Sequence, residues 1–311
     1  MLLVLARRLA NVIPTLVAVV ALVFLLFSVL PGSFISGMSE DGRTTIDPAV
    51  MERMRKEMGL DDPLPERFAK YVAHTAVGDL GISFRTREPV TRLIGGRVWP
   101  SLKLVFAAMT FAILVGVPLG FLAALKPGSI VDTVSMVFAI SGLSLSQFWL
   151  GLMLMYLFAL NFKWLPSFGY GDGGLSHIIL PAIALGVGPM ALLARTTRAA
   201  VLEILNADFV RTARSKGMSE RRVVEWHVLR NALVLVITIV GLQFGSLMGA
   251  AVVIEKLFAW PGVGSLLIDS VFQRDIPTVQ GCILLIVLFF LLINTLVDLA
   301  YVAIDPRIRH G

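Results

Sequence analysis

The residues best suited to chemistry through charge lie in a basic segment, residues 198–230, which is rich in arginine and broken once at Gly217. Residues 208–216 are predicted to form a short helix that carries Arg214 and Lys216 near its C-terminal end, where the helix dipole favours cations. Gly217 suits the left-handed conformation that ends many helices. A stiff, charged pair of short helices can form charge-assisted hydrogen bonds with a partner protein.

Polar side chains flank this predicted turn of two helices. Asn206 or Asp208 can cap the first helix, and Ser219 can cap the second, because a side-chain oxygen there accepts from free backbone N–H groups. An alternative to a protein-binding surface is an interfacial loop whose arginines touch anionic lipid. Composition alone leaves both interpretations open.

The chain offers little that could catalyse a reaction. It contains no Gly-Lys pair, so the nucleotide-binding pattern G-x-x-x-x-G-K-[ST] is impossible. The four histidines are scattered, no H-E-x-x-H occurs, and no metal site is expected. Cys282 is the only cysteine, which excludes an intrachain disulfide. We therefore expect a protein that is not an enzyme by itself.

The elements that position the basic segment are apolar. Hydrophobic residues make up 57% of the 311 residues and charged residues 15%, against about 45–50% and 25% in soluble domains. A helix of about 20 apolar residues spans a bilayer core. Six runs lack Asp, Glu, Lys and Arg, namely 9–39, 104–125, 133–162, 173–194, 231–254 and 276–297. These runs predict an all-α integral membrane protein of about six transmembrane helices, the third of them over about 133–160.

The distribution of basic residues sets an expected topology. Lys and Arg accumulate in segments that six spans would place on one side, at Arg7, Arg8, Lys126, within 198–230, and at Arg307 and Arg309. The positive-inside rule assigns that side to the cytoplasm, with both termini there. The net charge of +6 fits this rule and is not taken as a sign of nucleic-acid binding.

The predicted organisation has four parts. Residues 1–31 form the N-terminal end and first transmembrane helix, which is too long for a cleavable signal segment. Residues 32–99 hold acids and bases in equal number and form a small extracytoplasmic subdomain, with short helices at 48–59 and 65–74. The alternative for this segment is a spacer. Residues 100–304 form a five-helix core, and 305–311 a cytoplasmic tail.

A few polar side chains interrupt the apolar runs. Ser144, Gln147 and Gln243 could line a translocation pathway. Small and polar residues also let helices approach closely, so packing is the alternative.

The basic segment resembles the EAA loop of ABC-importer permeases of the dipeptide/oligopeptide/nickel class. The resemblance rests on Asp208-Phe209-Val210-Arg211-Thr212-Ala213-Arg214-Ser215-Lys216-Gly217, on His227 and on Arg230-Asn231-Ala232-Leu233. Arg211 and Thr212 depart from the general E-A-A letters in the manner of the peptide branch. Similar motifs cover nearly the whole chain, including Met58-Gly59-Leu60-Asp61, Gly78-Asp79-Leu80-Gly81, Trp260-Pro261-Gly262-Val263-Gly264 and Asp305-Pro306-Arg307.

This resemblance implies a type I importer permease fold in the bacterial inner membrane and places the chain as the first of two homologous permease subunits. The implied partners are that second permease, two ATPase subunits that hold ATP and Mg²⁺, and a periplasmic or lipid-anchored binding protein; this chain binds no cofactor itself. The implied ATPase-coupling residues are Asp208, Arg211, Thr212, Ala213, Arg214, Lys216, Gly217, His227 and Arg230. Trp260, Pro261 and Gly262 are implied to contact the binding protein.

The expected substrate is a di- or oligopeptide, moved by alternating access. Glutathione and nickel chelates are alternatives within the same class. A self-contained secondary transporter or channel is the alternative of another class, although the internal repeats and paired mid-membrane charges typical of such carriers are not evident.

Overall fold

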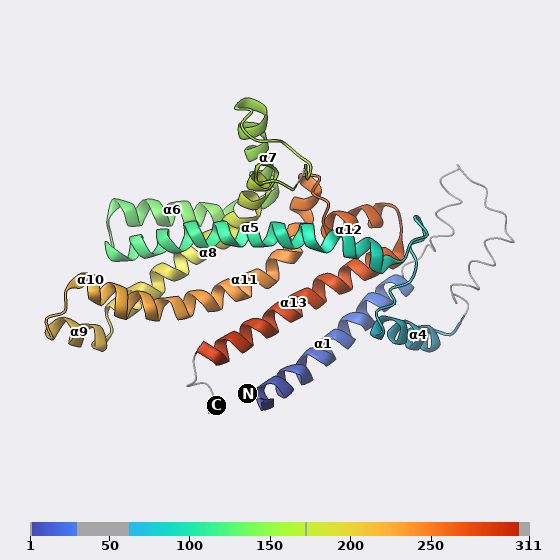
Figure 1. The fold of residues 1–311 in the computed structure, drawn as a ribbon, viewed down its shortest axis with the longest axis horizontal. Helices are drawn as coiled ribbons and strands as arrows, with labels where there is room; N and C mark the ends of the chain where they lie inside the picture. Colours follow the sequence, from blue (N-terminus) through green and yellow to red (C-terminus); the bar gives the residue numbers. More distant parts are fainter. Residues whose placement is uncertain (1, 30–61, 172, 305–311) are drawn as a thin grey trace. The chain divides into compact units, whose positions relative to one another are not determined.

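The structure is a computed structural model that describes residues 2–29, 62–171 and 173–304. Within those ranges every regular element is a helix, and the β-contact present is an isolated bridge between Ile82 and Pro89. The predicted all-α class is confirmed. The chain divides into two compact units, Met1–Trp99 with Val263–Leu288 and Pro100–Gly262 with Phe289–Gly311. Figure 1 shows the helices along the chain.

The first unit combines the N-terminal part of the sequence with a later segment, Val263–Leu288. It contains α1 (Leu2–Val29), α4 (Leu64–Ala76), the start of α5 (Val90–Leu125), α12 (Val263–Phe272) and the first part of α13 (Ile276–Ile304). Phe24 of α1 packs against Phe68 and Tyr71 of α4, with ring centroids 5.3 and 5.6 Å apart. The helix predicted at 65–74 is therefore present as α4, whereas the one predicted at 48–59 lies outside the described residues.

A second contact in this unit fixes the polar turn that precedes α5. The buried carboxylate of Asp275, just before α13, accepts hydrogen bonds from the Ser83 hydroxyl at 2.6 Å and the Phe84 N–H at 2.9 Å. The α5 helix begins at Val90, so the last ten residues of the segment predicted as an extracytoplasmic subdomain, 32–99, belong to a long membrane helix. Lys103 hid this extension, because it ends the apolar run 104–125 without ending the helix.

The second unit is built around α8 (Leu175–Leu205), which contacts α6 (Ile130–Ser144), α7 (Gln147–Leu154) and α11 (Arg230–Leu257). Two prolines, Pro181 and Pro189, lie inside α8 and are buried. A π-helical stretch, η1 (Met155–Asn161), continues α7, and a second, η2 (Val223–Leu229), precedes α11. Figure 1 shows α6 running alongside α8.

Within the described residues, each of the six charge-free runs is largely helical, but one is not a single span. Four described helices are long and apolar enough to cross a membrane: Val90–Leu125, Leu175–Leu205, Glu220–Leu257 and Ile276–Val297. The apolar stretch Ile13–Ser28 lies within α1. The predicted third helix is wrong as a continuous span, because α6 and the helix from Gln147 to Asn161 meet at 107°. Leu145 and Ser146 are extended there, which ends one helix and starts another.

Glycines allow the backbones of α5 and α8 to touch. An added Cβ at Gly116 would lie 2.5 Å from the Met190 carbonyl oxygen, and one at Gly120 would lie 2.2 Å from that of Ala194. Gly186 makes the reciprocal approach from α8, 2.6 Å from the Ala108 carbonyl oxygen. Small residues at such seams are typical of helix packing in membranes.

Candidate functional site

The candidate site is the turn of helices made by α9 (Asp208–Ser215), α10 (Glu220–Arg222) and η2, here called the knuckle (residues 208–230). One face of α9 is buried: Val210 is fully enclosed and Ala213 nearly so. They belong to a hydrophobic cluster with buried residues of α5, α8, η2 and α11, namely Ala124, Ala200, Val201, Val223, Val228 and Ala232. The knuckle is thus packed firmly onto the ends of three long helices.

The corner of the knuckle is a Schellman motif. The Gly217 N–H donates to the Arg214 carbonyl at 2.9 Å, and the Met218 N–H donates to the Ala213 carbonyl at 3.3 Å. Gly217 has φ +80°, the left-handed conformation that the sequence predicted for it. Met218 packs against the hydrophobic cluster, the apolar contact that accompanies this motif.

The predicted side-chain caps are absent. The residue at the N-cap of α9 is Ala207, and no side chain accepts from its first turn. The Asn206 amide instead donates to the Leu202 carbonyl at 3.0 Å, on the preceding helix. Ser219 occupies the N-cap of α10 as predicted, but its hydroxyl makes no capping bond. The packing of Val210 and Ala213 holds α9 in place without a polar cap.

Charges around the corner pair with one another. The Arg214 guanidinium makes two hydrogen bonds to Glu220, Nε to Oε1 at 2.7 Å and Nη2 to Oε2 at 3.2 Å, and so braces α9 against α10. Arg221 pairs with Glu225 at 2.8 Å. Arg214, which was predicted to couple to an ATPase subunit, thus already has a carboxylate partner within the chain.

The outward surface of the knuckle carries both charge and aromatic rings. Arg211 lies 3.8 Å from Asp208 and is 73% exposed in its side chain, and Lys216 is exposed. Phe209 and Trp226 are 46% and 65% exposed, although large aromatic side chains are usually buried. The sequence analysis did not predict these exposed aromatics. The available signal was that Phe209 and Val210 are neighbours in a short helix, so both cannot lie on its one buried face.

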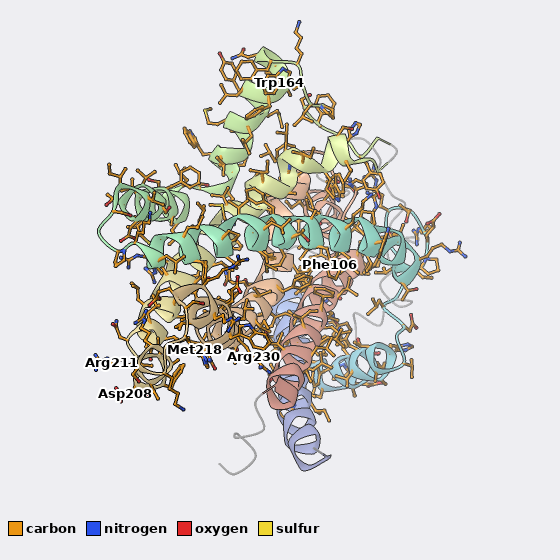
Figure 2. The ribbon with its side chains drawn as sticks, turned by 60° about the vertical axis from the view of Figure 1, so that its left-hand side comes forward. Phe106, Trp164, Asp208, Arg211, Met218 and Arg230 are labelled. Carbon is orange, nitrogen blue, oxygen red and sulfur yellow. The ribbon has the colours of Figure 1, made fainter. Side chains whose placement is uncertain are left out.

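The remaining predicted coupling residues lie within or beside this surface. Thr212 donates its hydroxyl to the Asp208 carbonyl at 2.9 Å, which satisfies it within α9. His227 is half-buried in η2, with its ring centroid 6.5 Å from that of Phe209. Arg230 is exposed where α11 begins. Figure 2 shows Asp208, Arg211, Met218 and Arg230 at one end of the second unit and Trp164 at the other.

The residues predicted to line a pathway do not form one cluster. Ser144 and Gln147 flank the bend between α6 and α7; Ser144 donates to the Ile140 carbonyl at 3.1 Å and Gln147 to the Leu185 carbonyl at 3.5 Å. Gln243 is half-buried on α11. The position of Ser144 and Gln147 at the bend makes them the stronger pair of pathway candidates.

Trp260 is not a surface residue, and its interpretation as a contact for a binding protein is wrong for this side chain. It is fully buried, its Nε1–H donates to the Pro100 carbonyl at 2.9 Å, and its ring meets Tyr170 edge-on at 4.7 Å. Gly262 is buried too, against the Glu255 carboxylate, and only Pro261 is partly accessible. Trp-Pro-Gly forms a turn as its composition predicts, but the turn folds inward.

The described residues contain no group of three or more His, Cys, Asp or Glu side chains that could hold a metal ion. The polar groups of the knuckle are arginines, a lysine, hydroxyls and paired carboxylates. This arrangement can bind a protein surface through charge and aromatic contact.

Two solved structures share this fold. The chain resembles one in "Inward facing conformations of the MetNI methionine ABC transporter", with a TM-score of 0.60, 20% identity, and coverage of 70% of this chain and 99% of that one. A second is "Crystal structure of an amino acid ABC transporter with histidines", with a TM-score of 0.55, 18% identity, and coverage of 68% and 94%. These similarities establish the fold, and the type I permease prediction is confirmed.

Sequence relatives cover almost the whole chain. Proteins named "Glutathione transport system permease protein GsiC" are 44% identical in Pectobacterium atrosepticum and 43% identical in Escherichia coli K12, each over 98% of both chains. Residues 116–310 match the family described as "Binding-protein-dependent transport system inner membrane component", and residues 1–105 match the N-terminal part of such membrane components. The chain therefore belongs to this family and is an inner-membrane permease subunit of an ABC importer of the dipeptide/oligopeptide/nickel class.

Proposed function

We propose that this permease imports short peptides, with glutathione as the first candidate, by alternating access driven through the knuckle. The observation that carries the coupling part of the proposal is that α9 is buried on one face and exposed on the other. Val210 and Ala213 lock it to the ends of α5, α8 and α11, while Phe209, Arg211 and Lys216 stay exposed for a partner. A force on α9 is transmitted to the membrane helices, because the close-packed side chains between them have low compressibility. The substrate part is supported by the relatives named for glutathione transport.

The proposed partners follow from the same arrangement. Two ATPase subunits that carry ATP and Mg²⁺ would bind the knuckles of this chain and of a second, homologous permease. A binding protein on the outer side would deliver substrate, and both termini of this chain would face the cytoplasm. Non-catalytic in itself, the chain would bind no cofactor.

The peptide proposal can be tested by uptake in proteoliposomes that contain the permease pair, both ATPase subunits and the binding protein. We expect ATP-dependent uptake of labelled glutathione, competed by excess unlabelled short peptide and little affected by a nickel chelate. Competition by the chelate alone would move the assignment to metal-chelate import. Uptake that persists without ATP would contradict the importer proposal and favour a secondary transporter.

The role of the knuckle predicts a large effect of Gly217→Leu. A side chain at φ +80° costs about 1–2 kcal/mol, which shifts the local folding equilibrium roughly 5- to 30-fold against the Schellman corner. We expect ATPase activity that no longer responds to substrate and binding protein, and uptake lowered by at least the same factor. The measurement is uptake and ATP hydrolysis in the same proteoliposomes.

Gly78→Leu is a matched control for backbone strain. Gly78 also has φ +80°, follows α4 in a Schellman motif in which the Asp79 N–H donates to the His74 carbonyl at 2.9 Å, and has open space around its Cβ position. The same strain there lies in the other unit and should leave coupling intact. Equal loss of coupling in both variants would contradict a specific role for the knuckle.

A further inference from the structure

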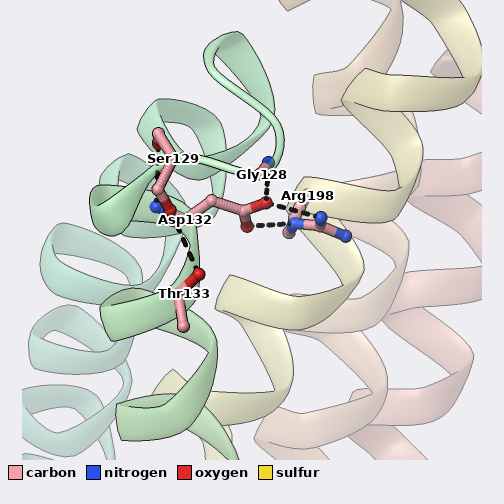
Figure 3. Close-up of polar contacts among 5 residues, drawn as sticks. All are labelled: Gly128, Ser129, Asp132, Thr133 and Arg198. Carbon is pink, nitrogen blue, oxygen red and sulfur yellow. Dashed lines mark hydrogen bonds and ion pairs between the residues drawn. The ribbon is translucent and has the colours of Figure 1, made fainter.

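A partly buried ion pair joins α6 to α8 away from the exposed surface of the knuckle. The Arg198 guanidinium makes two hydrogen bonds to the Asp132 carboxylate, Nε to Oδ1 at 2.5 Å and Nη2 to Oδ2 at 2.8 Å (Figure 3). The Asp132 side chain is 6% exposed and that of Arg198 29%. The two residues are far apart in sequence, so the pair is a tertiary link.

The surrounding backbone fixes the carboxylate in position. The Gly128 N–H donates to Asp132 Oδ2 at 2.9 Å, and the Ser129 hydroxyl accepts from the Asp132 N–H at 3.2 Å as the N-cap of α6. Figure 3 shows these groups converging on Asp132 from the turn before α6. Because the carboxylate is held from both sides, displacement of Arg198 would pull on the start of α6 itself.

The rest of the α6–α8 contact is made by small apolar side chains. Ala139 of α6 forms a buried cluster with Ala191 and Ala194 of α8, and Gly142 faces Val187 and Ala191. Such a seam of small side chains allows close approach but offers no interlocking ridge against sliding. Among the described residues, Asp132–Arg198 is the one ion pair between these two helices.

The pair also lies between two parts that the proposed transport cycle must connect. Arg198 is in the last turns of α8, two positions before Ala200, which packs with Val201 into the core of the knuckle. Asp132 is in the first turn of α6, whose other end is the 107° bend beside Ser144 and Gln147.

From this placement we infer that Asp132 and Arg198 are positioning residues that transmit displacement of the knuckle to the bent α6–α7 segment. The inference rests on the proposed function. In this scheme α8 moves with the knuckle. The bidentate contact between Arg198 and Asp132 then makes α6 move with α8.

The test measures substrate transported per ATP hydrolysed in proteoliposomes of the complete transporter. We expect Asp132→Asn to lower this ratio about 5- to 150-fold, the usual range of coupling between sites, while ATP hydrolysis continues. Glu203→Gln is the control, because it makes the same acid-to-amide change at an exposed side chain of α8 and keeps the ion pair. We expect it to leave the ratio at the parental value.

A covalent replacement separates transmission from mere stability. Asp132→Cys with Arg198→Cys, in a Cys282→Ala background, should be uncoupled until a short bifunctional thiol reagent links the two cysteines, and coupled afterwards. A linked transporter that stays uncoupled, or an unlinked one that matches the parent, would overturn the inference. If the parent itself shows no ATP-driven uptake, the proposed function fails instead; if the parent is active and Asp132→Asn matches it, this inference alone fails.

Discussion

Trp260→Ala is expected to destabilise the folded permease by about 3–5 kcal/mol, the usual cost of truncating a buried aromatic side chain. Trp260 is fully buried, and its ring meets Tyr170 edge-on. Truncation would leave a large cavity and strip the Pro100 carbonyl of the indole N–H that it accepts at 2.9 Å. That carbonyl belongs to a proline inside α5, where Pro100 already disturbs the regular helix bonding.

The measurement is thermal or denaturant unfolding of the purified permease in detergent. Trp99→Ala is a close control, because Trp99 is 67% exposed and should change stability by less than about 0.5 kcal/mol. Trp260→Phe separates the two contributions: it keeps most of the apolar volume, so its smaller loss of about 0.5–1.5 kcal/mol would report the missing indole hydrogen bond. Equal stability of the Trp260→Ala and Trp99→Ala variants would show that the indole is not part of the core.

The helical framework could be predicted because charge placement decides it. An apolar stretch without Asp, Glu, Lys or Arg must satisfy its backbone internally in a membrane, which favours a helix in each of the six runs. The corner at Gly217 was equally readable, since a basic helix end followed by glycine has few alternatives to a left-handed cap. Both features depend on residues that are adjacent in sequence.

The features that sequence reasoning missed depend on contacts between distant residues. Nothing in the letters Trp-Pro-Gly tells whether the indole faces outward; the carbonyl of Pro100, 160 positions away, decides it. The bend at Leu145 contains neither proline nor glycine, so the run around it reads as one span. The pairing of Arg214 with Glu220 was not predicted, because Glu220 lies beyond the Gly217 corner and only the folded corner brings the two together.

Gly120→Ala is expected to destabilise the permease by about 3 kcal/mol, the upper end of the usual cost of overpacking. The added Cβ would lie 2.2 Å from the Ala194 carbonyl oxygen, 2.9 Å from its carbonyl carbon and 2.9 Å from Thr197 Cβ. None of these atoms ends a flexible side chain, so relief requires α5 and α8 to separate. Unfolding of the purified variant and parent in the same detergent would measure the difference.

Gly96→Ala is the matched control, because it makes the same change in the same helix with open space around the new Cβ. There alanine should be neutral or stabilise by up to about 1 kcal/mol, since glycine loses more backbone entropy on folding. The two changes in stability have opposite signs because the α8 backbone lies against Gly120, whereas nothing lies against Gly96. If Gly120→Ala were as well tolerated as Gly96→Ala, α5 and α8 could not be in backbone contact, and the seam that holds α8 beneath the knuckle would have to be formed by other residues.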